Sequence, residues 1–133
     1  MFGYVAGLPW FLAYFIAAIV LLFGFATVYA KVTPHDEMAL IRSGNGAAVT
    51  AYLGAVLGFA LALASAAANS VSFGDFVIWA IIGMLIQIGA FFAANSLMSD
   101  LPGRIARNEI PAGAWAGGIA LTIGILNAAC MTY

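Results

Sequence analysis

Few side chains in this sequence could do chemistry, and one group of them is the run Thr33-Pro34-His35-Asp36-Glu37, which holds the only histidine. Histidine and carboxylates are metal ligands, but consecutive residues on a helix point about 100° apart and do not converge on one ion. We expect instead that Thr33 caps a short helix that begins at Pro34. The carboxylates of Asp36 and Glu37 would then lie at the positive end of the helix dipole, with His35 exposed. No metal site is predicted.

A second group consists of polar residues inside long apolar stretches, and its deepest members are Gln87 and Asn127. Polar side chains within a membrane span either bond to neighbouring helices, for about 0.6 to 2 kcal/mol, or mark a path for solutes. We expect Gln87 and Asn127 to make interhelical hydrogen bonds. A polar path formed by the same two residues is the alternative.

Cys130 is the only cysteine, so it can form neither an internal disulfide nor a structural zinc site by itself. We expect it to pack as a small apolar side chain, with an exposed thiol as the alternative. No carboxylate or base lies deep in an apolar stretch, and no nucleophile, base and orienting group can be assembled from the sequence. The chain is therefore expected to be no enzyme and to hold no cofactor.

Composition places the protein in a membrane. Of 133 residues, 65% are hydrophobic and 7% are charged, and the mean hydropathy is +1.10. Soluble domains carry about 25% charged residues, and disordered chains have low hydrophobicity, so both classes are excluded. Four Lys and Arg in a chain of net charge −1 offer no basic surface for nucleic acid. The predicted partner is the lipid bilayer.

The charged residues divide the chain into uncharged stretches, each of which can cross a bilayer once. A helix needs about 20 apolar residues to span roughly 30 Å of hydrocarbon, where its backbone must bond within the segment. We therefore predict an all-α membrane protein with four transmembrane helices, the third capped by Asp75. The helices are placed near Leu8–Ala30, Gly46–Asn69, Asp75–Leu97 and Ala112–Met131.

Basic residues predict the orientation of these helices. Lys31 and Arg42 flank the first connection, Arg104 and Arg107 lie in the third, and the middle connection has none. Because cytoplasmic loops carry the excess of Lys and Arg, the first and third connections are predicted to be cytoplasmic and both termini to face outward. The first connection would hold a short cytoplasmic elbow helix from Pro34 to about Ser43.

Small residues recur at helical spacing in the second and fourth stretches, where they allow helix backbones to approach closely. These two helices are therefore expected to be central and to pack on each other, with a subunit interface as the alternative. The first helix is rich in phenylalanine and is expected to face lipid. The packing glycines are Gly54 and Gly58 in the second stretch and Gly113, Gly117 and Gly124 in the fourth, and the lipid-facing set is Phe11, Phe15, Leu22, Phe23 and Phe25.

A shift of 64 residues superposes the two halves as span, basic connection and small-residue span. This pattern predicts two parallel two-span units, residues 1–69 and 75–133. Few letters match at this shift, so four spans of similar composition without shared ancestry remain the alternative.

Several segments taken together resemble the YjfL family of small bacterial inner-membrane proteins, a domain of unknown function. They are Thr33 to Glu37, Leu40-Ile41, Asn45-Gly46-Ala47-Ala48, Ser65 to Ser72, and the ending from Asn127 to Thr132. The resemblance covers nearly all of the chain from Thr33 to Tyr133. It implies a multi-pass inner-membrane protein with duplicated two-span units and no established activity.

Genes of this family often lie beside those of membrane-stress coat proteins, which implies a role in envelope maintenance. Where the second unit of the family commonly has an asparagine, this chain has Glu109, so Asn45 alone would retain a contact to a partner. Together these features favour a structural or adaptor component, packed as a homo-oligomer, that presents its cytoplasmic elbows to a peripheral membrane protein. The alternative is a subunit of a small channel or permease with a polar path near Gln87 and Asn127.

Overall fold

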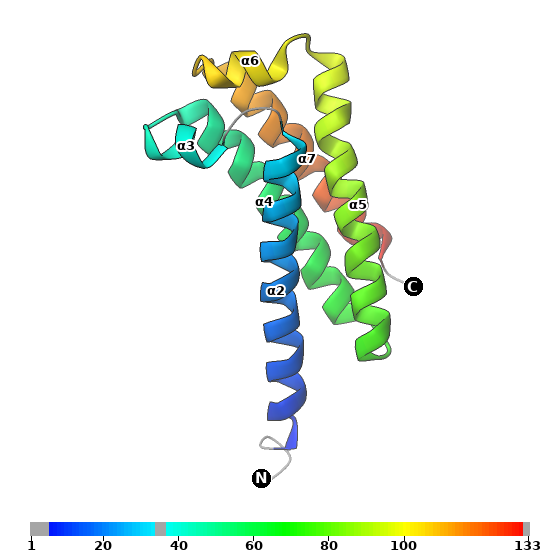
Figure 1. Ribbon diagram of the computed structural model, residues 1–133. Coiled ribbons are helices and arrows are strands. Elements are labelled where there is room, and N and C mark those ends of the chain that lie inside the picture. The colour runs from blue at the N-terminus through cyan, green and yellow to red at the C-terminus, as the bar shows by residue number, and fades with distance from the viewer. Residues whose placement is uncertain (1–5, 34–36, 132–133) are drawn as a thin grey trace.

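The computed structural model describes residues 6–33 and 37–131, and the helices in these ranges confirm an all-helical protein with four helices of membrane-spanning length and hydropathy. Each long helix lies within two residues of its expected bounds. Two short helices follow the first and third long ones (Figure 1). In chain order the elements are α2 (Leu8–Val32), α3 (Glu37–Arg42), α4 (Gly46–Asn69), α5 (Phe73–Leu97), α6 (Leu101–Ala106) and α7 (Ile110–Cys130).

Helices α4 and α7 form the centre of the bundle and make its most extensive contact. The two helices run parallel, because the numbers of the residues that meet increase in the same direction along both helices. A Cβ built on Gly113 would meet the Ala47 backbone, one on Gly54 would meet Gly117, and one on Gly124 would meet Gly58. Glycine thus brings the two backbones into direct contact, which maximises dispersion attraction where lipid supplies no hydrophobic driving force.

Helix α5 packs against both central helices, whereas α2 lies outside them against α4 and α5. Half of an apolar 18-residue stretch of α4 is buried (50%), compared with 6% in α2. Phe11, Phe15 and Phe23 are exposed as expected for a lipid-facing helix, but the expectation for Phe25 was wrong. The Phe25 ring is fully buried and stacks on Phe59 of α4, with ring centroids 4.7 Å apart.

The two short helices lie at the same end of the molecule and end in the same way (Figure 1). After α3, Gly44 has a φ of 88° and the Asn45 amide donates to the Leu40 carbonyl. After α6, Asn108 has a φ of 61° and the Glu109 amide donates to the Arg104 carbonyl. Both turns use the left-handed conformation that closes a helix end, which glycine and asparagine adopt most readily.

Two helix caps differ from those expected. Ser72, not Asp75, caps α5: its hydroxyl accepts from the Asp75 amide, and the Asp75 carboxylate accepts from the Val71 amide. Thr33 closes the C-terminal end of α2, and its hydroxyl donates to the Tyr29 carbonyl. The expected helix start at Pro34, with His35 and Asp36, lies outside the described residues.

Candidate functional site

Gln87 is buried where three helices meet, with 1% of its surface exposed. It belongs to α5, and its side-chain amide Nε2 donates to the carbonyl of Ala120 in α7 at 2.7 Å, with a longer contact of 3.5 Å to the Ala55 carbonyl in α4. Gly58 makes this possible, because a Cβ there would collide with the Gln87 amide. Among the described residues, none donates to the Gln87 Oε1 atom.

Asn127 lies on α7 and reaches the same face of α5 one turn away from Gln87. Its side-chain amide donates to the carbonyl of Gly83 at 3.3 Å, and Gly83 also contacts the buried Met131 side chain. The structure therefore brings the two predicted intramembrane polar residues together along the α5–α7 contact, each bonded to the backbone of another helix.

Further polar side chains bond across the bundle in the same manner. The Ser65 hydroxyl of α4 donates to the Ala128 carbonyl of α7 at 2.6 Å. The Trp115 indole of α7 donates to the Ala94 carbonyl of α5 at 3.2 Å. Because a backbone carbonyl has a second lone pair beyond its helix bond, such contacts join helices without breaking either ladder.

Glu37 is the residue whose position sequence reasoning missed. It was expected at the exposed start of the elbow, but its side chain is 1% exposed and points between α2 and α4. There it lies near the side chains of Tyr29 and Tyr52. The sequence does contain a signal for this burial. Glu37 lies three and four residues before the apolar Leu40 and Ile41, so it shares their face of α3. Thr33 is also buried, with 4% of its surface exposed.

Asn45 connects the first turn of α4 with the end of α6. Its Oδ1 accepts from the Ala48 amide at 2.9 Å, and its Nδ2 donates to the carbonyls of Ile105 and Ala106 at 2.9 and 3.2 Å. Asn108 makes a related bond, with its Oδ1 accepting from the Ala47 amide at 3.0 Å. The two asparagines therefore tie each half of the chain to the other at the end that holds the short helices.

Asn45→Ala is expected to lower the free energy of unfolding by about 2 kcal/mol, because it removes a helix cap and leaves the buried Ile105 carbonyl and the Ala106 carbonyl without their side-chain donor. Asn45→Asp keeps the acceptor but loses the donor, so it should recover only part of the loss. Denaturant titration in detergent micelles measures both variants. Equal stability of Asn45→Ala and the unchanged protein would contradict this role.

The charged residues in and around α6 pair with one another at the surface. Arg104 lies 3.2 Å from Glu109, and Arg107 lies 3.3 Å from Asp100 and 3.2 Å from Glu109. Exposed pairs of this kind contribute about 0 to 1 kcal/mol. Within the two described ranges, no three His, Cys, Asp or Glu side chains lie close enough to hold a metal ion. Cys130 is exposed, which corrects the expectation that it packs inside the bundle.

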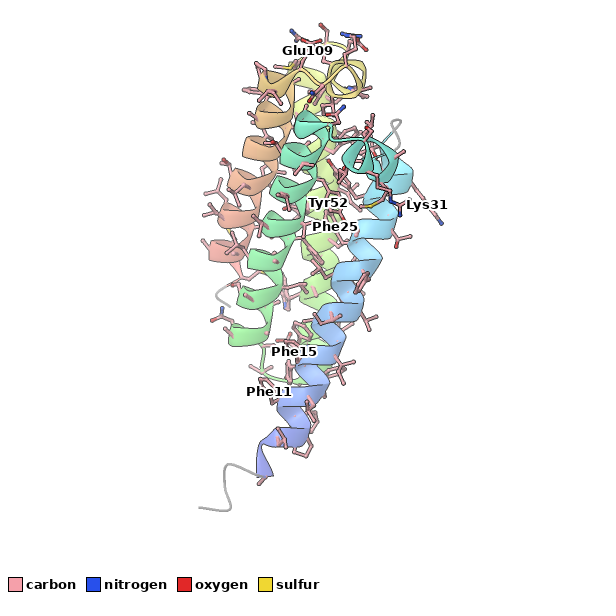
Figure 2. The ribbon with its side chains drawn as sticks, turned by 90° about the vertical axis from the view of Figure 1, so that its left-hand side faces the viewer. Phe11, Phe15, Phe25, Lys31, Tyr52 and Glu109 are labelled. Atoms are coloured by element: carbon pink, nitrogen blue, oxygen red, sulfur yellow. The ribbon has the colours of Figure 1, made fainter. Side chains whose placement is uncertain are left out.

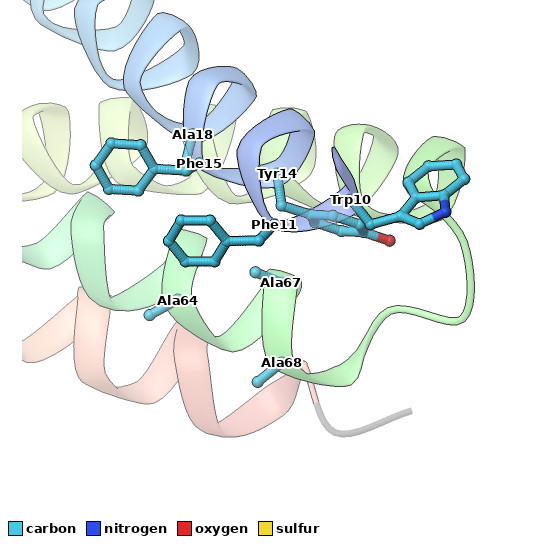
Figure 3. Close-up of a pocket in the computed structure, with 8 residues that line it drawn as sticks. All are labelled: Trp10, Phe11, Tyr14, Phe15, Ala18, Ala64, Ala67 and Ala68. Carbon is cyan, nitrogen blue, oxygen red and sulfur yellow. The ribbon is translucent and has the colours of Figure 1, made fainter. Parts of the chain in front are cut away.

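A crevice separates α2 from α4 at the end away from the short helices. This outer crevice has a volume of about 520 Å³ and no charged side chain among its described lining residues (Figure 3). Aromatic rings of α2 form one wall and alanines of α4 the other. The lining consists of Trp10, Phe11, Tyr14, Phe15, Ala18, Ala64, Ala67 and Ala68.

Comparison with known proteins places the chain in a family. Residues 3–131 match the model of the Domain of Unknown Function (DUF350) family. The inner membrane protein YjfL of Escherichia coli K12 is 40% identical over 123 residues, which cover 92% of this chain and 93% of that protein, and the protein of strain O157:H7 matches equally. No solved structure matches. With four apolar helices and this similarity, the chain is an inner-membrane protein that belongs to the DUF350 family.

Proposed function

We propose that this protein is a structural or adaptor component of an envelope-maintenance system, which packs as an oligomer and presents its short helices to a cytoplasmic partner. The proposal rests on the hydrogen bonds that the intramembrane polar side chains make with neighbouring helices. Gln87, Asn127 and Ser65 all donate to the backbone of a neighbouring helix. Their donors serve the contacts between helices rather than a path for solute.

The correspondence between the two halves of the chain supports the two-unit organisation in this proposal. Helices α3, α6 and the starts of α4 and α7 correspond at a constant shift, with residues 37, 42 and 46 matching 101, 106 and 110. The backbone bonds that close the short helices correspond at the same shift. Two units related in this way run in the same direction, as α4 and α7 do.

The charge distribution supports a cytoplasmic location for the short helices. Lys31, Arg42, Arg104 and Arg107 all lie next to or within the two connections at that end, and Figure 2 shows Lys31 and Glu109 there, far from Phe11 and Phe15. Because Lys and Arg are retained on the cytoplasmic side, the opposite ends of the helices would face outward.

Assembly into a homo-oligomer is supported by the outer face of α7. Ala114, Gly118 and Thr122 are spaced by four residues and are exposed, and no described residue lies within 4 Å of a Cβ built on Gly118. Small residues at this spacing let a second helix approach closely. The same feature that joins α4 to α7 is thus repeated on a surface that another copy can use.

The partner would meet the exposed side of α3. Met38, Arg42 and Ser43 are exposed there, whereas Glu37 points inward. A photo-reactive amino acid at Met38 is expected to crosslink a peripheral protein in intact cells, and Arg42→Glu should abolish the crosslink. The matched control position is Ile81, an exposed apolar residue of α5 within the membrane span. Equal labelling from both positions, or persistence in Arg42→Glu, would contradict the adaptor function.

A channel is the second candidate, because the Gln87 Oε1 atom is buried without a donor among the described residues. Purified protein in liposomes distinguishes the two functions. The adaptor predicts ion and solute release no faster than from empty vesicles. Release that depends on the protein and changes in Gln87→Leu, with the oligomer intact, would establish the channel instead.

A further inference from the structure

A second groove between α2 and α4 lies at the end that holds the short helices. It consists of two adjoining parts of about 110 and 420 Å³, which share Phe23, Ala26 and Tyr52. The smaller part lies deeper in the span and is completed by Leu22 and Val56. The larger part is completed by Thr27, Ala30, Lys31, Glu37 and Met38.

The groove changes character along its length. Its deep part is bounded by aliphatic and aromatic side chains, whereas its other end is lined by Lys31, Tyr52 and Thr27, with the buried Glu37 among them. Lys31 is exposed at the rim, and Figure 2 shows it projecting from the end of α2, with Tyr52 of α4 across from it. One end therefore suits a hydrocarbon chain and the other a polar headgroup with both a negative and a positive part.

The length of the groove matches one leaflet of a bilayer. Along α2 it extends from Leu22 to Lys31, which is about 14 Å at 1.5 Å per residue. Half of the hydrocarbon thickness is about 15 Å. A ligand that fills this groove from the rim would reach the middle of the membrane, as an acyl chain does.

We propose that the groove binds one phospholipid with a zwitterionic, primary-amine headgroup from the leaflet at this end. An acyl chain lies along Phe23 and Ala26, and the phosphate accepts hydrogen bonds from the Lys31 ammonium. The lipid ammonium then faces the wall that includes the Tyr52 and Thr27 hydroxyls, with the buried carboxyl group of Glu37 behind it. Lys and phosphate form a charge-assisted hydrogen bond, and the ring of Tyr52 can also attract a cation.

The formal charges of the lining favour this headgroup over others. Lys31 and Glu37 are one basic and one acidic residue, so the lining matches a headgroup that has one charge of each sign. A purely anionic headgroup would find no use for the carboxyl group. A trimethylated amine would keep its charge but could not donate hydrogen bonds to the Tyr52 or Thr27 hydroxyl.

The outer crevice is an internal comparison. It also lies between α2 and α4 and has a similar volume, of about 520 Å³, but its described lining has no charged side chain. This lining has no charged group with which to choose a headgroup or to retain a lipid through one. Lys31 is the one described basic residue that lines either the groove or the outer crevice. Selectivity for a headgroup phosphate should therefore depend on Lys31.

The test uses native mass spectrometry of the full chain, purified in detergent and titrated with three lipids of identical acyl chains. These are a phosphatidylethanolamine, a phosphatidylcholine and a diacylglycerol. One phosphatidylethanolamine per chain should be retained, about fivefold more strongly than phosphatidylcholine, and diacylglycerol should be lost. Equal retention of the first two lipids, or retention of diacylglycerol, would overturn the assignment.

Two pairs of variants locate the site. Lys31→Gln should weaken retention of phosphatidylethanolamine about tenfold, whereas Arg42→Gln, which removes an exposed cation outside the groove, should not. Ala26→Leu fills the groove and should prevent retention, whereas Ala13→Leu on the same helix should leave it unchanged. If Lys31→Gln and Arg42→Gln retain the lipid equally, the headgroup does not lie in this groove.

Discussion

Gly54→Leu is expected to separate α4 from α7 and to lower the free energy of unfolding by more than about 3 kcal/mol. A Cβ at residue 54 would overlap the backbone of Gly117, which has no flexible end to move aside. Relief requires the helices to move apart, and that movement weakens the dispersion contacts along their whole length. Because lipid tails are as apolar as the helix surfaces, no hydrophobic driving force compensates for the lost packing.

Unfolding in mixed detergent micelles, followed by helical circular dichroism and by crosslinking between α4 and α7, measures this effect. Gly89→Leu is the matched control, since Gly89 is exposed on α5 and no described residue lies within 4 Å of an added Cβ. It should leave stability within about 0.5 kcal/mol of the unchanged protein. If the two variants are equally stable, the close α4–α7 contact is absent in the membrane.

Gln87→Ala should cost about 2 to 4 kcal/mol, whereas Gln87→Leu should cost no more than about 1 kcal/mol. Alanine removes the hydrogen bond to Ala120 and leaves a cavity between three helices. Leucine loses the same bond but fills most of the volume, and it also removes the buried Oε1 atom, which has no donor among the described residues. The difference between the variants therefore separates packing from hydrogen bonding.

The same unfolding assay measures both Gln87 variants, and Ile86→Ala serves as the control because Ile86 is an exposed neighbour on α5. A large loss of unfolding free energy in Gln87→Leu would show that the amide stabilises the bundle by more than its volume and its one short hydrogen bond can explain. A loss in Gln87→Ala no larger than in Ile86→Ala would show that residue 87 does not lie at the centre of the bundle.

Much of the fold follows from the sequence because hydrocarbon leaves few choices. Apolar length and charge position predict the four helices, and the spacing of Gly54, Gly58, Gly113 and Gly117 predicts which face of α4 and α7 is packed. Helix bounds are predicted less well where a cap decides them. Ser72 starts α5 two residues earlier than expected because its hydroxyl, rather than the Asp75 carboxylate, receives the first free amide.

The errors at Phe25 and Glu37 have one cause. Periodicity shows which side of a helix is apolar, but not which neighbour will cover it. Helix α3 packs against α4, which places Glu37 near Tyr29, and α2 also packs against α4, which buries Phe25 against Phe59. Both contacts join segments across a connection whose path the sequence pattern does not specify.

The parallel arrangement of α4 and α7 has a consequence for biogenesis. Two parallel helices cannot be joined by a short turn, so their contacts connect residues about 60 positions apart, as in the bonds from Asn45 to Ile105 and from Ser65 to Ala128. Long-range contacts of this kind form late, because the intervening chain must be ordered first. During synthesis, the glycine face of α4 enters the membrane well before its partner and is covered only when the last helix inserts.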